Sequence, residues 1–125
     1  MGEKQKKVLV YEKDQQTASC IEFGVRQFDL TPLKASSREA AQRLLQEEPF
    51  GIAFVNAALP ALSLQEGTVI VPILDRGASR DDLLSGCSYV RVLYKPAGIF
   101  EVMAIIKNIL DPAVAHSKDY FYHML

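Results

Sequence analysis

Five short apolar runs recur along the chain, and longer segments with apolar residues at helical spacing separate them. β-branched residues are common in these runs, which favours buried strands. The predicted strands cover residues 7–12, 31–35, 52–55, 69–74 and 90–94. Strands that alternate with helices build a parallel sheet covered on both faces, so we expect an α/β fold.

Four segments are predicted helices, and three of them begin with a capping residue. Asp14 can cap the first, Ser36 can cap the second in a capping box with Glu39, and Ser79 can cap the third. The second helix should end before Pro49, because the residue before a proline disfavours helical backbone. The predicted helices span residues 15–28, 37–48, 80–86 and 99–110.

The interval between the third and fourth predicted strands is unusually short. Only 12 residues separate Asn56 from Val69, whereas a parallel crossover needs about a dozen or more and usually contains a helix. We therefore expect the third crossover helix to be truncated or absent. Pro72, inside the fourth strand, predicts a sheet edge or a bulge there, because proline cannot donate a hydrogen bond to the ladder.

Length and composition indicate one ordinary globular domain, since the chain has 125 residues of which 49% are hydrophobic. We assign residues 1–112 to this domain and residues 113–125 to a tail or a linker toward an output domain. The net charge of −1 gives no basis for binding nucleic acid or a membrane surface. We expect a soluble cytoplasmic protein, with Cys20 and Cys87 as small buried residues.

Polar residues gather where the predicted strands end. In an open parallel sheet, ligands bind beyond the carboxyl ends of the strands, at the point where the strand order reverses. The residues at these ends, from the first strand to the fifth, are Glu12, Lys13 and Asp14, then Asn56, then Leu74 and Asp75, and finally Lys95. A lysine at such a site needs an acceptor, so we expect Lys95 to pair with Glu12 or with the Asn56 carbonyl.

The segments VLVYEKD, FVNAALP and YKP, in this order and spacing, resemble the receiver domains of two-component response regulators. The resemblance covers about residues 7 to 110 and implies a flavodoxin-like (CheY-like) fold with five parallel strands. In this family, an acidic pair after the first strand and an aspartate after the third hold Mg²⁺, and the aspartate accepts a phosphoryl group. A Ser or Thr after the fourth strand and the lysine of a Lys-Pro pair grip the phosphoryl oxygens.

Mapped onto this chain, the resemblance implies a degenerate pocket. Glu12 fills the first acidic position and Lys95 the lysine position, but Lys13 replaces the second acid, Asn56 the phosphoacceptor and Leu74 the hydroxyl residue. The nitrogen lone pair of an amide is delocalised into the carbonyl, so Asn56 is no nucleophile. Replacing three carboxylates by one, beside an ammonium, also opposes Mg²⁺. We therefore expect a pseudo-receiver without metal, cofactor or enzymatic activity, which signals through a protein partner or an attached output domain.

Three alternatives remain open. Asn56 can be an ordinary strand-end residue in a turn. A flavodoxin-like nucleotide or flavin binder can use Thr17 and Ser19, although the segment EKDQQTAS lacks the glycines that let backbone amides approach a phosphate. Finally, a receiver can be phosphorylated at a displaced acid, either Asp14 or Asp75.

The last predicted helix is apolar over about twice the arc that a surface helix needs. Its narrow polar strip includes Glu101, Lys107, Asn108 and Asp111. Once the sheet-facing side is assigned, Phe100, Met103 and Leu110 remain along one flank. We interpret this flank as a protein interface that can support a homodimer. The alternative is that the aromatic-rich residues 113–125 fold back over it.

Overall fold

The computed structural model describes residues 6–56, 68–75 and 92–111. Its elements, in chain order, are β1 (Lys7–Tyr11), α1 (Gln15–Arg26), β2 (Thr31–Lys34), α2 (Arg38–Glu47), β3 (Ile52–Asn56), β4 (Val69–Asp75), β5 (Leu93–Lys95) and α3 (Ile99–Leu110). The predictions for the third crossover, the short helix after Ser79, Cys87 and the tail lie outside the described residues.

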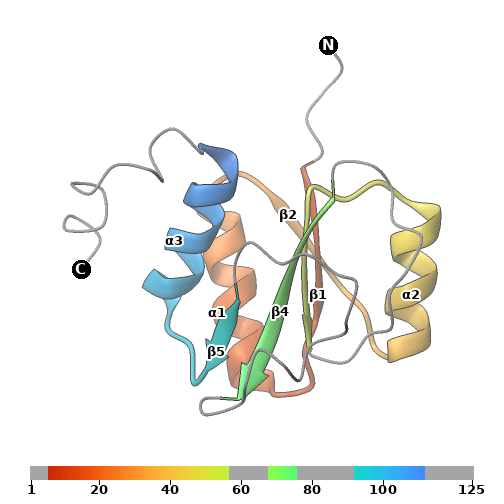
Figure 1. The fold of residues 1–125 in the computed structure, drawn as a ribbon, viewed down its shortest axis with the longest axis horizontal. Coiled ribbons are helices and arrows are strands. Elements are labelled where there is room, and N and C mark those ends of the chain that lie inside the picture. The colour runs from red at the N-terminus through yellow and green to blue at the C-terminus, as the bar shows by residue number, and fades with distance from the viewer. Residues whose placement is uncertain (1–5, 57–67, 76–91, 112–125) are drawn as a thin grey trace.

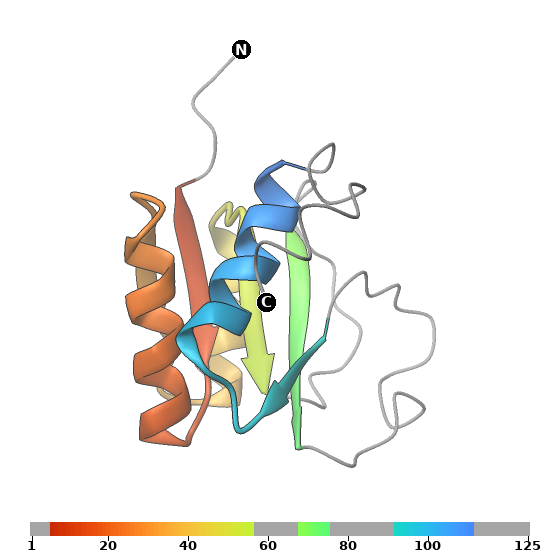
Figure 2. The same ribbon diagram turned by 90° about the vertical axis from the view of Figure 1, so that its left-hand side faces the viewer.

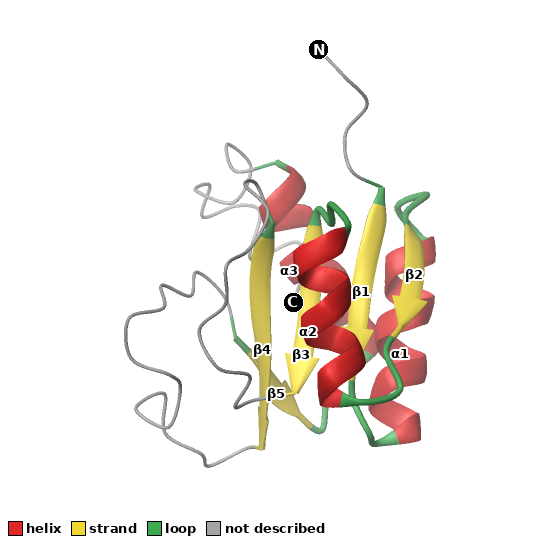
Figure 3. Cartoon of the chain, turned by 90° about the vertical axis from the view of Figure 1, so that its right-hand side faces the viewer, coloured by secondary structure: helices red, strands yellow, loops and turns green. Residues whose placement is uncertain are grey.

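All five strands form one parallel sheet in the order β2-β1-β3-β4-β5. The α/β prediction is confirmed, and this strand order is that of flavodoxin-like folds. The chain places β2 on one side of β1 and β3 on the other, so the strand order reverses between β1 and β3. Figure 3 shows the arrowheads of the strands directed toward the same edge of the sheet.

Helices cover both faces of the sheet: α1 and α3 lie on one face and α2 on the other (Figure 1). Alternation along each strand sends side chains to both layers. The core between the sheet and the α1–α3 layer contains Val8, Val10, Ile52, Phe54, Val71, Ile73 and Leu93. The core on the α2 side contains Leu9, Tyr11, Ala53 and Val55.

Helices α1 and α3 lie side by side on one face of the sheet (Figure 2). They approach each other closely at Gly24. A Cβ atom added at this glycine would lie 2.8 Å from Cγ1 of Val102 and 3.7 Å from Cγ of Met103. Val102 and Ile106 of α3 are fully buried in the same core as Ile21 and Val25 of α1. The absence of a side chain at Gly24 therefore lets α3 pack directly against α1.

Local details differ from the sequence prediction at three places. Ser37, not Ser36, caps α2, because its Oγ accepts the N–H of Ala40 at 3.0 Å. Pro72 lies inside the sheet, paired in register with Val55; within the described residues, β4 pairs with β5 only from Ile73 onward. Asn108, predicted on the polar strip, is buried, and its Oδ1 accepts no hydrogen bond.

Among the described helices, none has both the length and the apolar character needed to cross a membrane.

Candidate functional site

Four polar side chains belong to the same face of the sheet at the carboxyl ends of its strands. Glu12 continues the alternation of Val8 and Val10, while Asn56, Asp75 and Lys95 continue that of Phe54, Ile73 and Leu93, all in the core on the α1–α3 side. The strand registers bring the ends of β3, β4 and β5 together, since Asn56 is paired with Ile73 and Asp75 with Lys95. The site thus lies beside the point where the strand order reverses.

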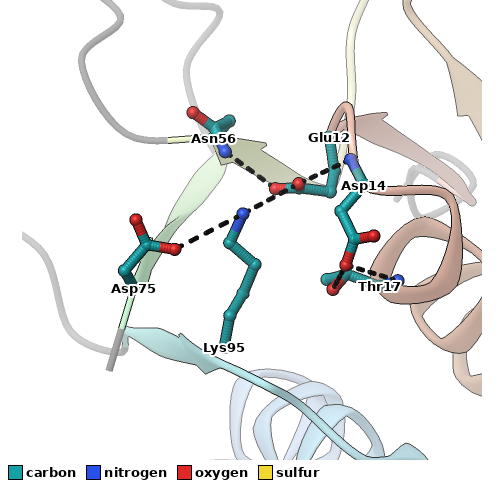
Figure 4. A network of polar contacts seen from close by, with 6 residues as sticks. All are labelled: Glu12, Asp14, Thr17, Asn56, Asp75 and Lys95. Atoms are coloured by element: carbon teal, nitrogen blue, oxygen red, sulfur yellow. Dashed lines mark hydrogen bonds and ion pairs between the residues drawn. The ribbon is translucent and has the colours of Figure 1, made fainter. Parts of the chain in front are cut away.

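The carboxylate of Glu12 is the centre of this site (Figure 4). Its side chain is only 1% exposed. Oε1 accepts a hydrogen bond from Nδ2 of Asn56 at 2.9 Å. Oε2 accepts one from the backbone N–H of Asp14 at 2.9 Å and one from Nζ of Lys95 at 3.1 Å. One buried carboxylate therefore holds the ends of β1, β3 and β5 together.

Lys95 carries the positive charge of the site and has two acidic neighbours. Besides Glu12, its ammonium faces Oδ1 of Asp75 at 3.7 Å, with side-chain exposures of 20% for Lys95 and 85% for Asp75. Burial alone would lower the pKa of Lys95. The hydrogen bond to Glu12 and the charges of Glu12, Asp75 and Asp14 outweigh burial and raise that pKa. The expected pairing of Lys95 with Glu12 is confirmed.

Asp14 caps the N-terminus of α1. Its Oδ2 accepts hydrogen bonds from the hydroxyl of Thr17 at 2.5 Å and from the N–H of Thr17 at 3.3 Å. The hydroxyl bond is the main reason that the pKa of Asp14 is lowered. A carboxylate therefore occupies the helix N-terminus where a nucleotide phosphate would bind, which disfavours the nucleotide-binding alternative.

Two residues assigned to the pocket lie apart from this network. Lys13 is exposed, and Leu74 is 3% exposed at a position that alternates with Ile73, away from the face carrying Lys95. The placement of Leu74 in the pocket is therefore corrected: Asp75, one residue later, is the β4 residue that faces Lys95. Counting the alternation from Val71 and Ile73 would have revealed this.

The side chains present do not fit Mg²⁺. Both oxygens of Glu12 already accept hydrogen bonds from the protein. The second acidic position is a lysine, and Asp14 is engaged by Thr17. In the part of the chain that the structure describes, no three His, Cys, Asp or Glu side chains are grouped so as to hold a metal ion.

Comparison with solved structures identifies the architecture. A response regulator receiver domain protein (CheY-like) from Methanospirillum hungatei JF-1 superposes with a TM-score of 0.69 at 16% sequence identity, covering 90% of this chain and 99% of that one. The fold is that of a receiver domain. The beryllofluoride-activated NtrC4 receiver domain dimer matches with a TM-score of 0.63 and 15% identity, over 86% of this chain and 98% of that one.

A third similar structure belongs to a protein of another description. It is described as an adenylate cyclase from Rhodopirellula baltica and has a TM-score of 0.59 at 14% identity, over 95% of this chain and 98% of that one. A scan against protein-family models finds no match, and a search of curated proteins finds none either. At these identities, the likeness establishes the receiver fold, and the chemistry must be argued from the side chains.

Sequence reasoning found Glu12, Asn56 and Lys95, and the structure brings these three into direct contact. It missed the hydrogen bond from the Thr17 hydroxyl to Asp14 and the ion pair between Asp75 and Lys95. The receiver resemblance drew attention to the positions that carry phosphoryl chemistry, and neither of these contacts belongs to that set.

Proposed function

We propose that this protein is a receiver-fold signalling module that does not accept a phosphoryl group and acts through protein–protein interaction or on an attached output domain. One observation carries the proposal: the buried carboxylate of Glu12 binds both the amide of Asn56 and the ammonium of Lys95. The lysine that would grip a phosphoryl group thus already has a partner inside the protein.

The chemistry of Asn56 supports the same conclusion. Its amide cannot attack phosphorus, and its Nδ2 donates to Glu12 instead. Asp75 adds a negative charge beside Lys95, where a receiver places a neutral hydroxyl. An incoming phosphoryl dianion would be repelled by Asp75 and Glu12 and would have to displace Lys95 from its ion pair. We therefore expect Lys95 to keep its ion pair with Glu12, and the pocket not to switch between an unphosphorylated and a phosphorylated state.

A module of this kind works by contact, and we place it in the cytoplasm as a non-enzymatic regulator. Similar structures include a receiver domain dimer and a protein described as an adenylate cyclase, which supports partners of both kinds, a second copy and an output domain. We assign residues 1–112 to the receiver-like domain and residues 113–125 to a tail or linker. The flank formed by Phe100, Met103 and Leu110 is the proposed interface.

The test is intact-mass measurement after incubation with acetyl phosphate and Mg²⁺, with a phosphorylatable receiver domain treated in parallel as a control for the donor. We expect a mass gain in the control and none in this protein. Titration with Mg²⁺ should show no saturable binding in the low-millimolar range. A stoichiometric phosphoryl gain that is lost on acid or base treatment would refute the proposal.

A second candidate is phosphorylation at a displaced acid, and the position of Asp75 gives it a structural basis. Its carboxylate is 85% exposed and lies 3.7 Å from the Lys95 ammonium, so a donor could reach it. Peptide mapping of any phosphorylated product, repeated with D75N and with D14N, would separate the two acids. A mass gain that is lost in D75N but kept in D14N would establish phosphorylation at Asp75 and would refute the proposal of a module that accepts no phosphoryl group.

A further inference from the structure

Strand β2 lies at one end of the sheet (Figure 3), and two hydrogen bonds show which of its residues face β1. The N–H of Thr31 donates to the carbonyl of Lys6 at 2.8 Å, and the N–H of Ala35 donates to the carbonyl of Val10 at 3.0 Å. In a parallel ladder, alternate residues of a strand direct their backbone groups toward the same neighbour. Residues 31, 33 and 35 therefore face β1, and residues 30, 32 and 34 face outward.

Two of these three outward positions have no backbone donor to offer. Pro32 has no N–H, and the N–H of Leu30 is already bonded to the carbonyl of Val25 at 3.4 Å. Of the three, this leaves the N–H of Lys34. Its side chain is 48% exposed and forms an ion pair with Glu22 of α1, in which Nζ lies 3.5 Å from Oε2. A proline costs the sheet nothing at position 32, because the missing donor would have pointed away from β1.

We propose that Pro32 closes this edge of the sheet to strand pairing, so that no extended strand of another protein chain is added beside β2. An unpaired edge strand otherwise presents a row of N–H and C=O groups, which is a template for pairing with another chain. The proposal goes beyond the signalling function proposed above and does not depend on it. A partner that contacts this edge must bind through side chains instead of the backbone.

Pairing of β2 with β2 of a second copy is weakened in each antiparallel register. If the two-fold axis passes at Leu33, each Pro32 lies opposite Lys34 of the second copy, and half of the hydrogen bonds are missing because the proline cannot donate. If it passes at Pro32, neither proline donates, and the next pair needs the N–H of Leu30, which is bonded to Val25. If it passes at Lys34, two like charges stand directly opposite each other, which is destabilising.

The variant that tests the proposal is P32V, which restores an outward N–H and keeps an apolar side chain of high strand propensity. P49V is the matched control, because Pro49 is exposed and lies between α2 and β3, outside the sheet. Sedimentation equilibrium of the full chain compares both variants with the wild type over the same concentrations. We expect the weight-average mass of P32V to reach at least twice that of the wild type, while P49V follows the wild type. A P32V protein that keeps the wild-type mass at every concentration would overturn the proposal.

Amide hydrogen exchange, measured for each residue by NMR, locates the pairing and also tests the wild type alone. In the dilute wild type, we expect the N–H of Lys34 to exchange at least about tenfold faster than that of Leu33, which faces β1. In P32V, the amides of residues 32 and 34 should become protected as concentration rises. Association of P32V without this protection would place the contact elsewhere and overturn the proposal. Strong protection of Lys34 in the dilute wild type would overturn it too, whether or not P32V folds, because another group would then already cover this edge.

Discussion

Nζ of Lys95 lies 3.1 Å from Oε2 of Glu12, although 83 positions separate the two residues in the sequence. Two strands, β3 and β4, lie between β1 and β5 in the sheet, and the contact forms because all these strands end at the same edge of the sheet. The same carboxylate also accepts the Asn56 amide at 2.9 Å. The stability of the site therefore depends on one buried negative charge.

Replacing that charge should destabilise the protein. We expect E12Q to lower the free energy of unfolding by about 2 kcal/mol, because it leaves the mostly buried Lys95 ammonium without its nearest counter-charge. E48Q is the matched control: Glu48 pairs with Lys7, and both side chains are more than a third exposed, so the loss should be about 0.5 kcal/mol or less. Urea unfolding followed by circular dichroism measures both. Equal losses would contradict a special role for Glu12.

The ion pair also predicts a dependence on alkaline pH. The pKa of Lys95 is raised above its ordinary value of 10.5, because its hydrogen bond and attraction to Glu12 outweigh the effect of burial. The folded state therefore holds the proton more tightly than the unfolded state. The stabilisation is complete below 10.5 and is lost as pH rises from there through the folded pKa.

We therefore expect the difference in unfolding free energy between the wild type and K95M to shrink as pH rises above 10.5. K6M, at an exposed lysine, serves as the control for loss of one lysine charge. Urea titrations across this pH range give both differences. A wild-type advantage over K95M that grows with pH would show that the sign is wrong.

Close packing of α1 against α3 gives a third prediction. G24A should destabilise the protein, because the new Cβ would lie 2.8 Å from Cγ1 of Val102, a stiff β-branched side chain. Overpacking costs about 1–3 kcal/mol and is partly offset by the better helix propensity of alanine, worth roughly 1 kcal/mol. In a double-mutant cycle with V102A, the two changes should couple favourably. Additive effects would mean that a clash with Val102 is not the cause of the destabilisation.

Restoring the phosphoacceptor alone should not restore phosphorylation. N56D places a second carboxylate beside Glu12 while leaving Lys13 at the second acidic position, so Mg²⁺ still lacks its ligands. We expect no phosphoryl mass gain with acetyl phosphate and Mg²⁺ in N56D. The double variant K13D/N56D supplies three carboxylates and should bind Mg²⁺ more tightly than N56D in isothermal titration. Efficient phosphorylation of N56D would show that the amide alone blocks the pocket.

The sequence by itself determined the order of the elements and most of their bounds. Helix α3 begins and ends as its apolar spacing predicts, and β1 and β3 differ from prediction by a single terminal residue. These properties are local, because periodicity and capping are set by residues within a few positions of each other. The polar residues Glu12, Asn56 and Lys95 could also be found from the sequence, since each directly ends a predicted strand.

Only the tertiary structure decided which of these groups meet. Leu74 and Asp75 are adjacent in the sequence, yet alternation buries the first and turns the second toward Lys95. The sequence gives no sign of the role of Gly24, because Val102, which packs against it, lies 78 positions later in the chain. Such contacts depend on the register of parallel strands and on how two helices pack on one face. The strand register and the helix packing are both set by burial of the whole core, not by any local pattern. The apolar surface of each element is buried only when the other elements pack against it.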